Sequence, residues 1–306
     1  MVRLLNALAQ DETKMESLLN QMTQMARKLL LASNIETFSL CATPKKSDEV
    51  LSQFEQFVSN LPHNSTSKAT TSASGLGTEL GSSSTFMASP FPVHFCSAAL
   101  MGAPGYTHPD APPLRVLSRL LSSKYLHVEI REKGKAILQL FSQLVPNLKN
   151  QFRELVFFSS YLFVYLGGAY GGGCSANPTG GNFSFFSYRD PNFDRTMDIF
   201  HNSNNWIQKE NNFTQRDIDE AKLNVFKALD QPVLPSARGQ RLFLCGITDE
   251  QFENHRNMLR NVSIEDVKRV SEQYLGSSRE KAKETVLGPS SSANNSNFIV
   301  EELLNQ

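Results

Sequence analysis

This chain of 306 residues has no excess of charge of either sign, because its 30 Lys and Arg residues balance its 30 Asp and Glu residues. A neutral chain offers no bulk electrostatic attraction to nucleic acid or to an anionic membrane surface. We therefore expect neither nucleic acid nor a membrane as the partner of this protein.

Long apolar runs are also missing. The best one, residues 155–166, is twelve positions long and includes two serines, whereas a membrane-spanning helix needs about 18 apolar residues. The first residues lack the apolar core of a signal peptide, and Asp11, Glu12 and Glu16 make them unlike an acid-poor transit peptide. We expect the N-terminus to be the interior of a longer chain, without its targeting segment.

Metal and nucleophile motifs are absent as well. The four cysteines, Cys41, Cys96, Cys174 and Cys245, form no C-x-x-C pair, which predicts reduced thiols rather than a disulfide framework or a zinc knuckle. None of the six histidines stands in H-x-x-E-H, in H-E-x-x-H or in an i, i+4 pair. No G-x-S-x-G or Walker motif occurs. We therefore predict no metal site and no catalytic residue in this chain.

Apolar residues make up 40% of the sequence, which is enough to build a hydrophobic core. Apolar residues recur every three or four positions over residues 1–32, 47–61 and 114–128, and this spacing predicts helices. Few strands among many helices favour an α+β fold, with a mainly antiparallel sheet and helices packed on one face. We predict a helical tail of a preceding domain over residues 1–32, an α+β domain over 33–306, and a flexible Ser/Thr/Gly-rich loop over 63–89.

Helix starts are marked by capping residues. Asp110 precedes a helix with two prolines in its first turn, where a missing N–H costs little. Two further starts carry an acid three residues after the capping hydroxyl, at Thr214 and at Ser263.

The stretches Glu129–Gly134 and Gly168–Gly173 are interpreted as two halves of one motif. Arg131 offers a forked, permanently charged donor, and Tyr170 offers a phenol. The glycines would allow a backbone to run close to a bound chain. The alternatives are an ion pair of Arg131 with a neighbouring acid, an aromatic anchor at Tyr170, and a phosphate-binding module at the glycines. His127 is a candidate base or a packed or surface residue.

Together these stretches resemble the presequence proteases, a branch of the pitrilysin-type (inverzincin) zinc metalloendopeptidases. The resemblance rests on motifs that occur in the family's order. They are Tyr106-Thr-His-Pro-Asp110, Lys124-Tyr-Leu-His-Val-Glu-Ile-Arg-Glu-Lys-Gly134, Gly168-Ala-Tyr-Gly-Gly-Gly173, Phe185-Phe-Ser-Tyr-Arg-Asp-Pro191 and Phe213-Thr-Gln-Arg-Asp-Ile-Asp-Glu-Ala-Lys222.

This resemblance implies a C-terminal half whose zinc is bound by an N-terminal half that is missing here. It also implies that Arg131 and Tyr170 bind substrate, and that the complete enzyme degrades cleaved presequences and other short unfolded peptides in the mitochondrial matrix. The expected partners are those peptides and the N-terminal half of the same protease. This chain alone is expected to be inactive. The alternative is a non-catalytic peptide-binding or scaffold protein of the same fold.

One departure from the family is the segment 135–167, because in the family Glu-Lys-Gly runs directly into Gly-Ala-Tyr. Arg131 and Tyr170 are therefore 39 positions apart. Gly134-Lys135 is compatible with a 5′ splice signal, and the Phe-rich run 157–163 with a pyrimidine tract. We hypothesise a retained intron or a gene-model error, with a genuine loop insertion as the alternative.

Sequencing of the spliced transcript tests this hypothesis. We expect messages that join the codon of Gly134 to that of Gly168. A predominance of messages that contain the codons for residues 135–167 would show that the segment is a genuine insertion.

Overall fold

The structure, a computed structural model, describes residues 12–29, 45–61, 84–133, 169–276, 282–295 and 298–302. The chain divides into two compact units, one with residues 1–81, 232–250 and 305–306 and the other with residues 82–231 and 251–304. The segment 135–167 lies outside the described residues. The predicted domain boundary at residue 32 stays a prediction.

The first unit contains helices in its described parts. These are α2 (Glu12–Leu29), α3 (Ser47–Ser59), the short 3-10 helix η4 (Pro235–Ala237) and α11 (Gln240–Cys245). Helices α2 and α3 confirm the helical periodicity in the parts of 1–32 and 47–61 that are described. In the described ranges, no helix combines the length and the apolar character needed to cross a membrane.

The second unit is built on a six-stranded sheet with the order β3-β4-β2-β5-β1-β6. Its strands are β1 (Thr85–Ser89), β2 (His94–Met101), β3 (Gly171–Asn177), β4 (Asn182–Asp190), β5 (Lys283–Pro289) and β6 (Ile299–Glu302). Strand β1 occupies the end of the predicted loop 63–89, so that prediction is wrong for residues 85–89. The reason is that Phe86 and Ala88 alternate with outward residues and are buried in the core.

The pairing of the strands is mixed. Strands β3, β4, β2 and β5 pair antiparallel in succession, whereas β1 pairs parallel with both β5 and β6. The predicted α+β class is confirmed, and the antiparallel pairs form the part of the sheet that carries the candidate site.

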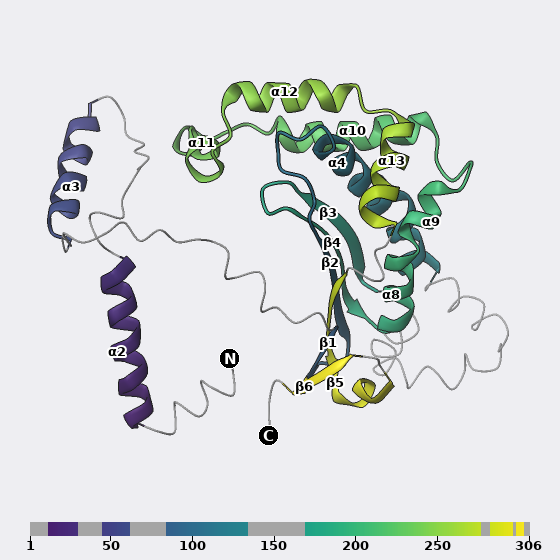
Figure 1. Ribbon diagram of the computed structural model, residues 1–306, viewed down its shortest axis with the longest axis horizontal. Helices are drawn as coiled ribbons and strands as arrows, with labels where there is room; N and C mark the ends of the chain where they lie inside the picture. Colours follow the sequence, from purple (N-terminus) through teal and green to yellow (C-terminus); the bar gives the residue numbers. More distant parts are fainter. Residues whose placement is uncertain are drawn as a thin grey trace, which may run out of the picture. The chain divides into compact units, whose positions relative to one another are not determined.

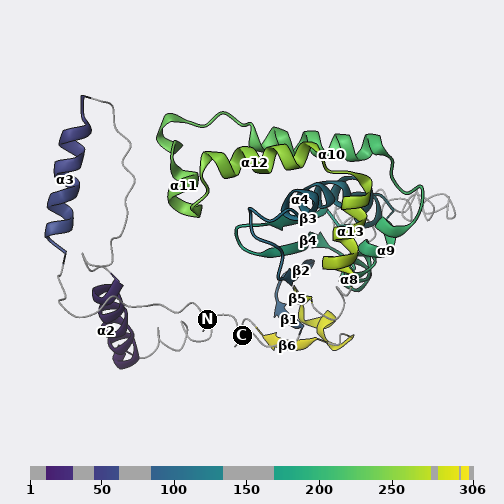
Figure 2. The ribbon, with the colours of Figure 1, turned by 45° about the horizontal axis from the view of Figure 1, so that its top comes forward.

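Helices lie over one face of this sheet (Figures 1 and 2). They are α4 (Ala111–Leu120), its π-helical continuation η3 (Leu121–Glu132), α8 (Phe193–His201), α9 (Ser203–Gln208), α10 (Gln215–Leu229), α12 (Asp249–Arg260) and α13 (Ile264–Leu275). Strand β4 shows the two faces directly, because Phe183 and Phe185 are 1% exposed while Phe186 and Tyr188 are 44% and 38% exposed. The core therefore lies between sheet and helices, and the opposite face presents aromatic rings.

The two capping boxes are confirmed at Thr214 and Ser263. Asp110 precedes α4 as predicted, but its side chain makes no capping hydrogen bond. Its carboxylate instead accepts from the hydroxyl of Tyr274 at 2.9 Å and lies 2.8 Å from Nη2 of Arg269. These contacts tie the start of α4 to α13, and they replace the predicted cap because two strong donors outcompete a backbone N–H.

His255 on α12 is fully buried and stacks on the ring of Tyr106, with the ring centroids 4.3 Å apart. Its Nε2 accepts from Nη1 of Arg115 at 3.3 Å, and its Nδ1 donates to the backbone oxygen of Tyr106 at 3.1 Å. Burial, aided by the charge of Arg115, lowers the pKa of His255 to about 4.

We predict a pH-dependent stability from this histidine. Below pH 6.5, the ordinary pKa of histidine, His255 takes up a proton in the unfolded chain but stays neutral in the folded chain. The free energy of unfolding therefore falls as the pH drops from about 6.5 to about 4. The loss is on the order of 2–3 kcal/mol. Denaturant titrations at several pH values measure it, and His255→Gln should flatten the slope between pH 6.5 and pH 5. Equal slopes for the two proteins would contradict the assignment.

Candidate functional site

Arg131 lies in the last turn of η3. Its Nη1 donates to Nε2 of His127 at 3.4 Å, and Nδ1 of His127 lies 3.3 Å from Oε1 of Glu132. Because a guanidinium only donates, Nε2 of His127 must accept, and the ring proton then faces Glu132. His127 is half exposed and holds the arginine, which agrees with a surface histidine rather than with a base.

Tyr170 stands directly before β3 and follows the segment 135–167 in the sequence, and its side chain lies next to that of Arg131. The Cζ atom of Arg131 lies 5.9 Å from the centroid of the Tyr170 ring, within the range of a cation–π contact. The Tyr170 ring is 60% exposed and lies 5.5 Å from the ring of Tyr188. The structure therefore brings together the two residues that the sequence singled out.

Packing of η3 on β3 produces this meeting. The hydroxyl of Ser122 on η3 accepts from the backbone N–H of Cys174 at 2.9 Å and lies 3.1 Å from the backbone oxygen of Cys174, to which it donates. Burial raises the pKa of the Cys174 thiol to about 12, so the thiol stays protonated and donates to the backbone oxygen of Ser118 at 3.2 Å. These contacts fix the helix that carries Arg131 against the strand that follows Tyr170.

The glycines of β3 serve this packing. A Cβ at Gly171 would lie 2.6 Å from the Tyr188 ring, and a Cβ at Gly172 would lie 3.1 Å from Cδ1 of Ile130 on η3. The glycines thus make room for this chain's own ring and helix, and not for a bound chain as the sequence suggested. They lie in a paired strand and not in a loop at a helix N-terminus, so they offer no phosphate cradle.

A third residue, Arg189, joins the site through a break in the strand register. Phe95 pairs with Tyr188 and His94 pairs with Asp190, which leaves Arg189 as the extra residue of a β-bulge. Its φ is 53°, in the left-handed region. For a residue with a Cβ this conformation costs about 1–2 kcal/mol. Its guanidinium lies 5.7 Å from the centroid of the Tyr170 ring, and its backbone oxygen accepts from the Tyr170 N–H at 3.4 Å.

Asp190 holds this bulge in place. Its buried carboxylate accepts from the hydroxyls of Ser187 at 2.8 Å and Thr196 at 2.6 Å, and from the backbone N–H of Asn192 at 2.9 Å. Sequence reasoning noted the Tyr-Arg-Asp-Pro stretch but did not assign Arg189, because neither the register shift nor the sign of φ can be read from residue types.

The electrostatics of the site are those of two cations beside aromatic rings, of which Arg131 is partly buried and Arg189 is exposed. Within the described ranges, no carboxylate oxygen lies within the 4.0 Å of an ion pair from either guanidinium, Arg131 or Arg189. The nearby acid Glu129 pairs with Lys133 instead. Guanidinium groups donate to carbonyl, carboxylate or developing oxyanion groups, so the arrangement suits a peptide backbone.

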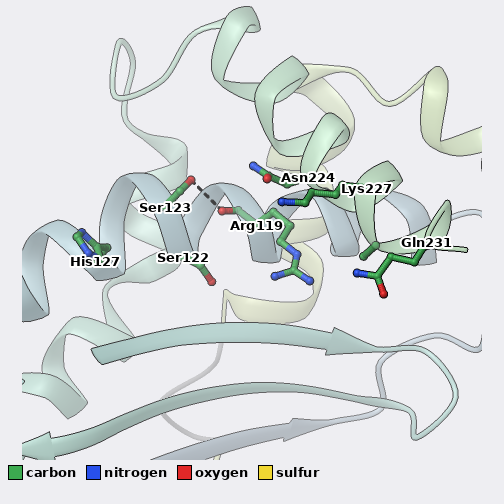
Figure 3. Close-up of a pocket in the computed structure, with 8 residues that line it drawn as sticks. Arg119, Ser122, Ser123, His127, Asn224, Lys227 and Gln231 are labelled. Carbon is green, nitrogen blue, oxygen red and sulfur yellow. Dashed lines mark hydrogen bonds between the residues drawn. The ribbon is translucent and has the colours of Figure 1, made fainter. Parts of the chain in front are cut away.

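A separate cavity of about 550 Å³ lies between the α4–η3 helix and α10 (Figure 3). His127 lines it together with Arg119 and Lys227, and the hydroxyl of Ser123 donates to the backbone oxygen of Arg119 at 3.0 Å. His127 thus connects this cavity with Arg131, but the residues that line the cavity include neither Arg131 nor Tyr170. Over the described part of the chain, no group of three or more His, Cys, Asp or Glu residues is placed to hold a metal ion.

Comparison with known proteins identifies the family. Residues 155–290 match the model of the PreP C-terminal domain. The mitochondrial presequence protease of Saccharomyces cerevisiae is 32% identical over 290 residues, which cover 94% of this chain and 26% of the relative. That of Schizosaccharomyces pombe is 33% identical over 301 residues, which cover 98% of this chain and 26% of the relative. The chain belongs to the presequence-protease family and carries its C-terminal domain.

Solved structures resemble the chain more distantly. The crystal structure of the peptidase M16 inactive domain from Pseudomonas fluorescens has a TM-score of 0.44 and 16% identity, and the match covers 68% of this chain and 44% of that one. The chain spans about a quarter, 26%, of the length of the curated relatives it matches.

We predict that Gly171→Ala disturbs the site. The new Cβ must displace the Tyr188 ring, which is the partly exposed end of a side chain, so we expect a loss at the low end of the range for overpacking, about 1 kcal/mol. Denaturant unfolding measures the loss. The matched control is Gly105→Ala, because a Cβ at Gly105 meets no atom within 4 Å. Equal stability of the two variants would contradict the close packing of β3 against β4.

Proposed function

We propose that this chain is the C-terminal, non-zinc half of a mitochondrial metalloendopeptidase that degrades cleaved presequences and other short unfolded peptides in the matrix. The family assignment supports this proposal, because the relatives are named mitochondrial presequence proteases. The observation that carries it is the contact between Arg131 and Tyr170, at 5.9 Å, across 39 positions of sequence.

The role of the chain is to bind the peptide backbone. The guanidinium of Arg131 donates to a peptide carbonyl, and the phenol of Tyr170 donates to a second acceptor or to the oxygen on which charge develops. The exposed rings of Phe95, Phe186 and Tyr188 continue this surface along β2 and β4 and contact apolar side chains of the substrate. An unfolded peptide satisfies both needs, because its backbone groups are free.

Zinc has no fitting set of ligands within the part of this chain that the structure describes. In this proposal the metal belongs to the N-terminal half of the complete enzyme, and none of the steps described for Arg131 and Tyr170 passes through it. The second candidate is a peptide-binding or scaffold protein of the same fold. The two differ in one outcome, since only the protease half gives hydrolysis when it is combined with a zinc-bearing half.

We expect the purified 306-residue chain to bind a fluorescently labelled presequence-like peptide without cleaving it. Loss of a hydrogen bond from a charged donor costs about 1.5–3 kcal/mol. Arg131→Ala should therefore raise the Kd for the peptide by about tenfold or more. Tyr170→Phe removes a neutral donor and should raise it by about two- to tenfold. Fluorescence anisotropy measures both.

Arg216→Ala is the control, because Arg216 is an exposed arginine that pairs with Glu220 on α10. Its Kd should equal that of the unchanged chain. Unchanged binding in both site variants would refute the proposed role, and chelator-sensitive hydrolysis by the chain alone would refute the non-zinc assignment.

A further inference from the structure

Arg189 occupies a position where the fold prefers glycine. It is the extra residue of the bulge between His94 and Phe95 of β2, and its φ of 53° is readily adopted only by a residue without a Cβ. A glycine there would keep the bulge and remove the strain. The chain therefore gives up stability in order to keep a long cationic side chain at this point.

The contacts of Arg189 show what this side chain does. It is exposed, so it fills no core. Among the described residues, no carboxylate lies within ion-pair distance of its guanidinium. Its guanidinium instead lies 5.7 Å from the centroid of the Tyr170 ring, and its backbone oxygen accepts from the Tyr170 N–H. Both its main chain and its side chain therefore act on one residue.

Tyr170 needs such a contact because 60% of its surface is exposed. An exposed phenol that can rotate is a poor donor to a bound peptide, since binding must first fix the ring. A bulge beside a site commonly serves to aim a side chain. Here the aimed guanidinium and that of Arg131 contact the same ring, at 5.7 and 5.9 Å.

We propose that Arg189 is a positioning residue of the peptide-binding site and that it acts by holding the ring of Tyr170 beside Arg131. This inference rests on the proposed function, because peptide binding is the property that the fixed ring serves. It adds a residue that touches Tyr170 and not the peptide.

The test measures peptide affinity and thermal stability in the full chain. Arg189→Gly should raise the Kd for the peptide by about two- to fivefold, which corresponds to the loss of an exposed cation–π contact. Its unfolding midpoint should equal or exceed that of the unchanged chain, because the strain is relieved. Arg189→Lys, which keeps a cation over the ring, should restore the affinity to within about twofold.

Asn211→Gly is the matched control, because Asn211 has a φ of 64° and lies on the loop between α9 and α10. It relieves the same backbone conformation and should leave the Kd unchanged. In a Tyr170→Ala background, Arg189→Gly should cause no further loss of affinity, since the ring that it holds is gone.

Four outcomes would overturn the inference. If Arg189→Gly binds like the unchanged chain while Tyr170→Ala binds weakly, the proposed function stands and the positioning role falls. An equal loss in the Tyr170→Ala background would mean that Arg189 contacts the peptide itself. A lowered unfolding midpoint for Arg189→Gly would make its role structural. If Arg131→Ala and Tyr170→Ala each bind the peptide with the affinity of the unchanged chain, both the proposed function and this inference are overturned.

Discussion

The packing of helix η3 on the glycine strand β3 is the contact on which the site depends. Ser122 both accepts from and donates to the backbone of Cys174, and Gly172 allows Ile130 to approach the strand. A Cβ in place of the Gly172 hydrogen would lie 3.1 Å from Cδ1 of Ile130, so the helix or its side chain would have to shift slightly away from the strand. Because Arg131 lies in the last turn of η3 and β3 begins directly after Tyr170, this one interface brings the two residues together.

A second constraint acts from the neighbouring strand. The buried carboxylate of Asp190 accepts hydrogen bonds from two hydroxyls and a backbone N–H. These bonds stabilise a bulge whose extra residue is Arg189. The outward face of the same strand carries the rings of Phe186 and Tyr188. Strand β4 therefore packs against the core with one face and forms a cationic, aromatic surface with the other.

The sequence predicted those parts of the fold that depend on local pattern. Helix periodicity and the capping boxes at Thr214 and Ser263 are local signals, and Arg131 and Tyr170 were found because they stand in specific motifs. Features set by pairing between distant residues were missed or misread. Strand β1 is short and follows a Ser-rich stretch, Arg189 depends on a register shift, and Gly171 and Gly172 face the chain's own Tyr188 and Ile130. Asp110 was placed correctly but given the wrong partner, since Arg269 is distant in sequence.

The central claim is that Arg131 and Tyr170 form one site, and a double-mutant cycle on the unfolding free energy tests it most directly. The cycle compares Arg131→Ala, Tyr170→Ala, the double variant and the unchanged chain by denaturant titration. A contact between a partly exposed guanidinium and a ring predicts a coupling energy of about 0.5–1 kcal/mol. Strictly additive effects of the two substitutions would show that the side chains do not meet and would contradict this account.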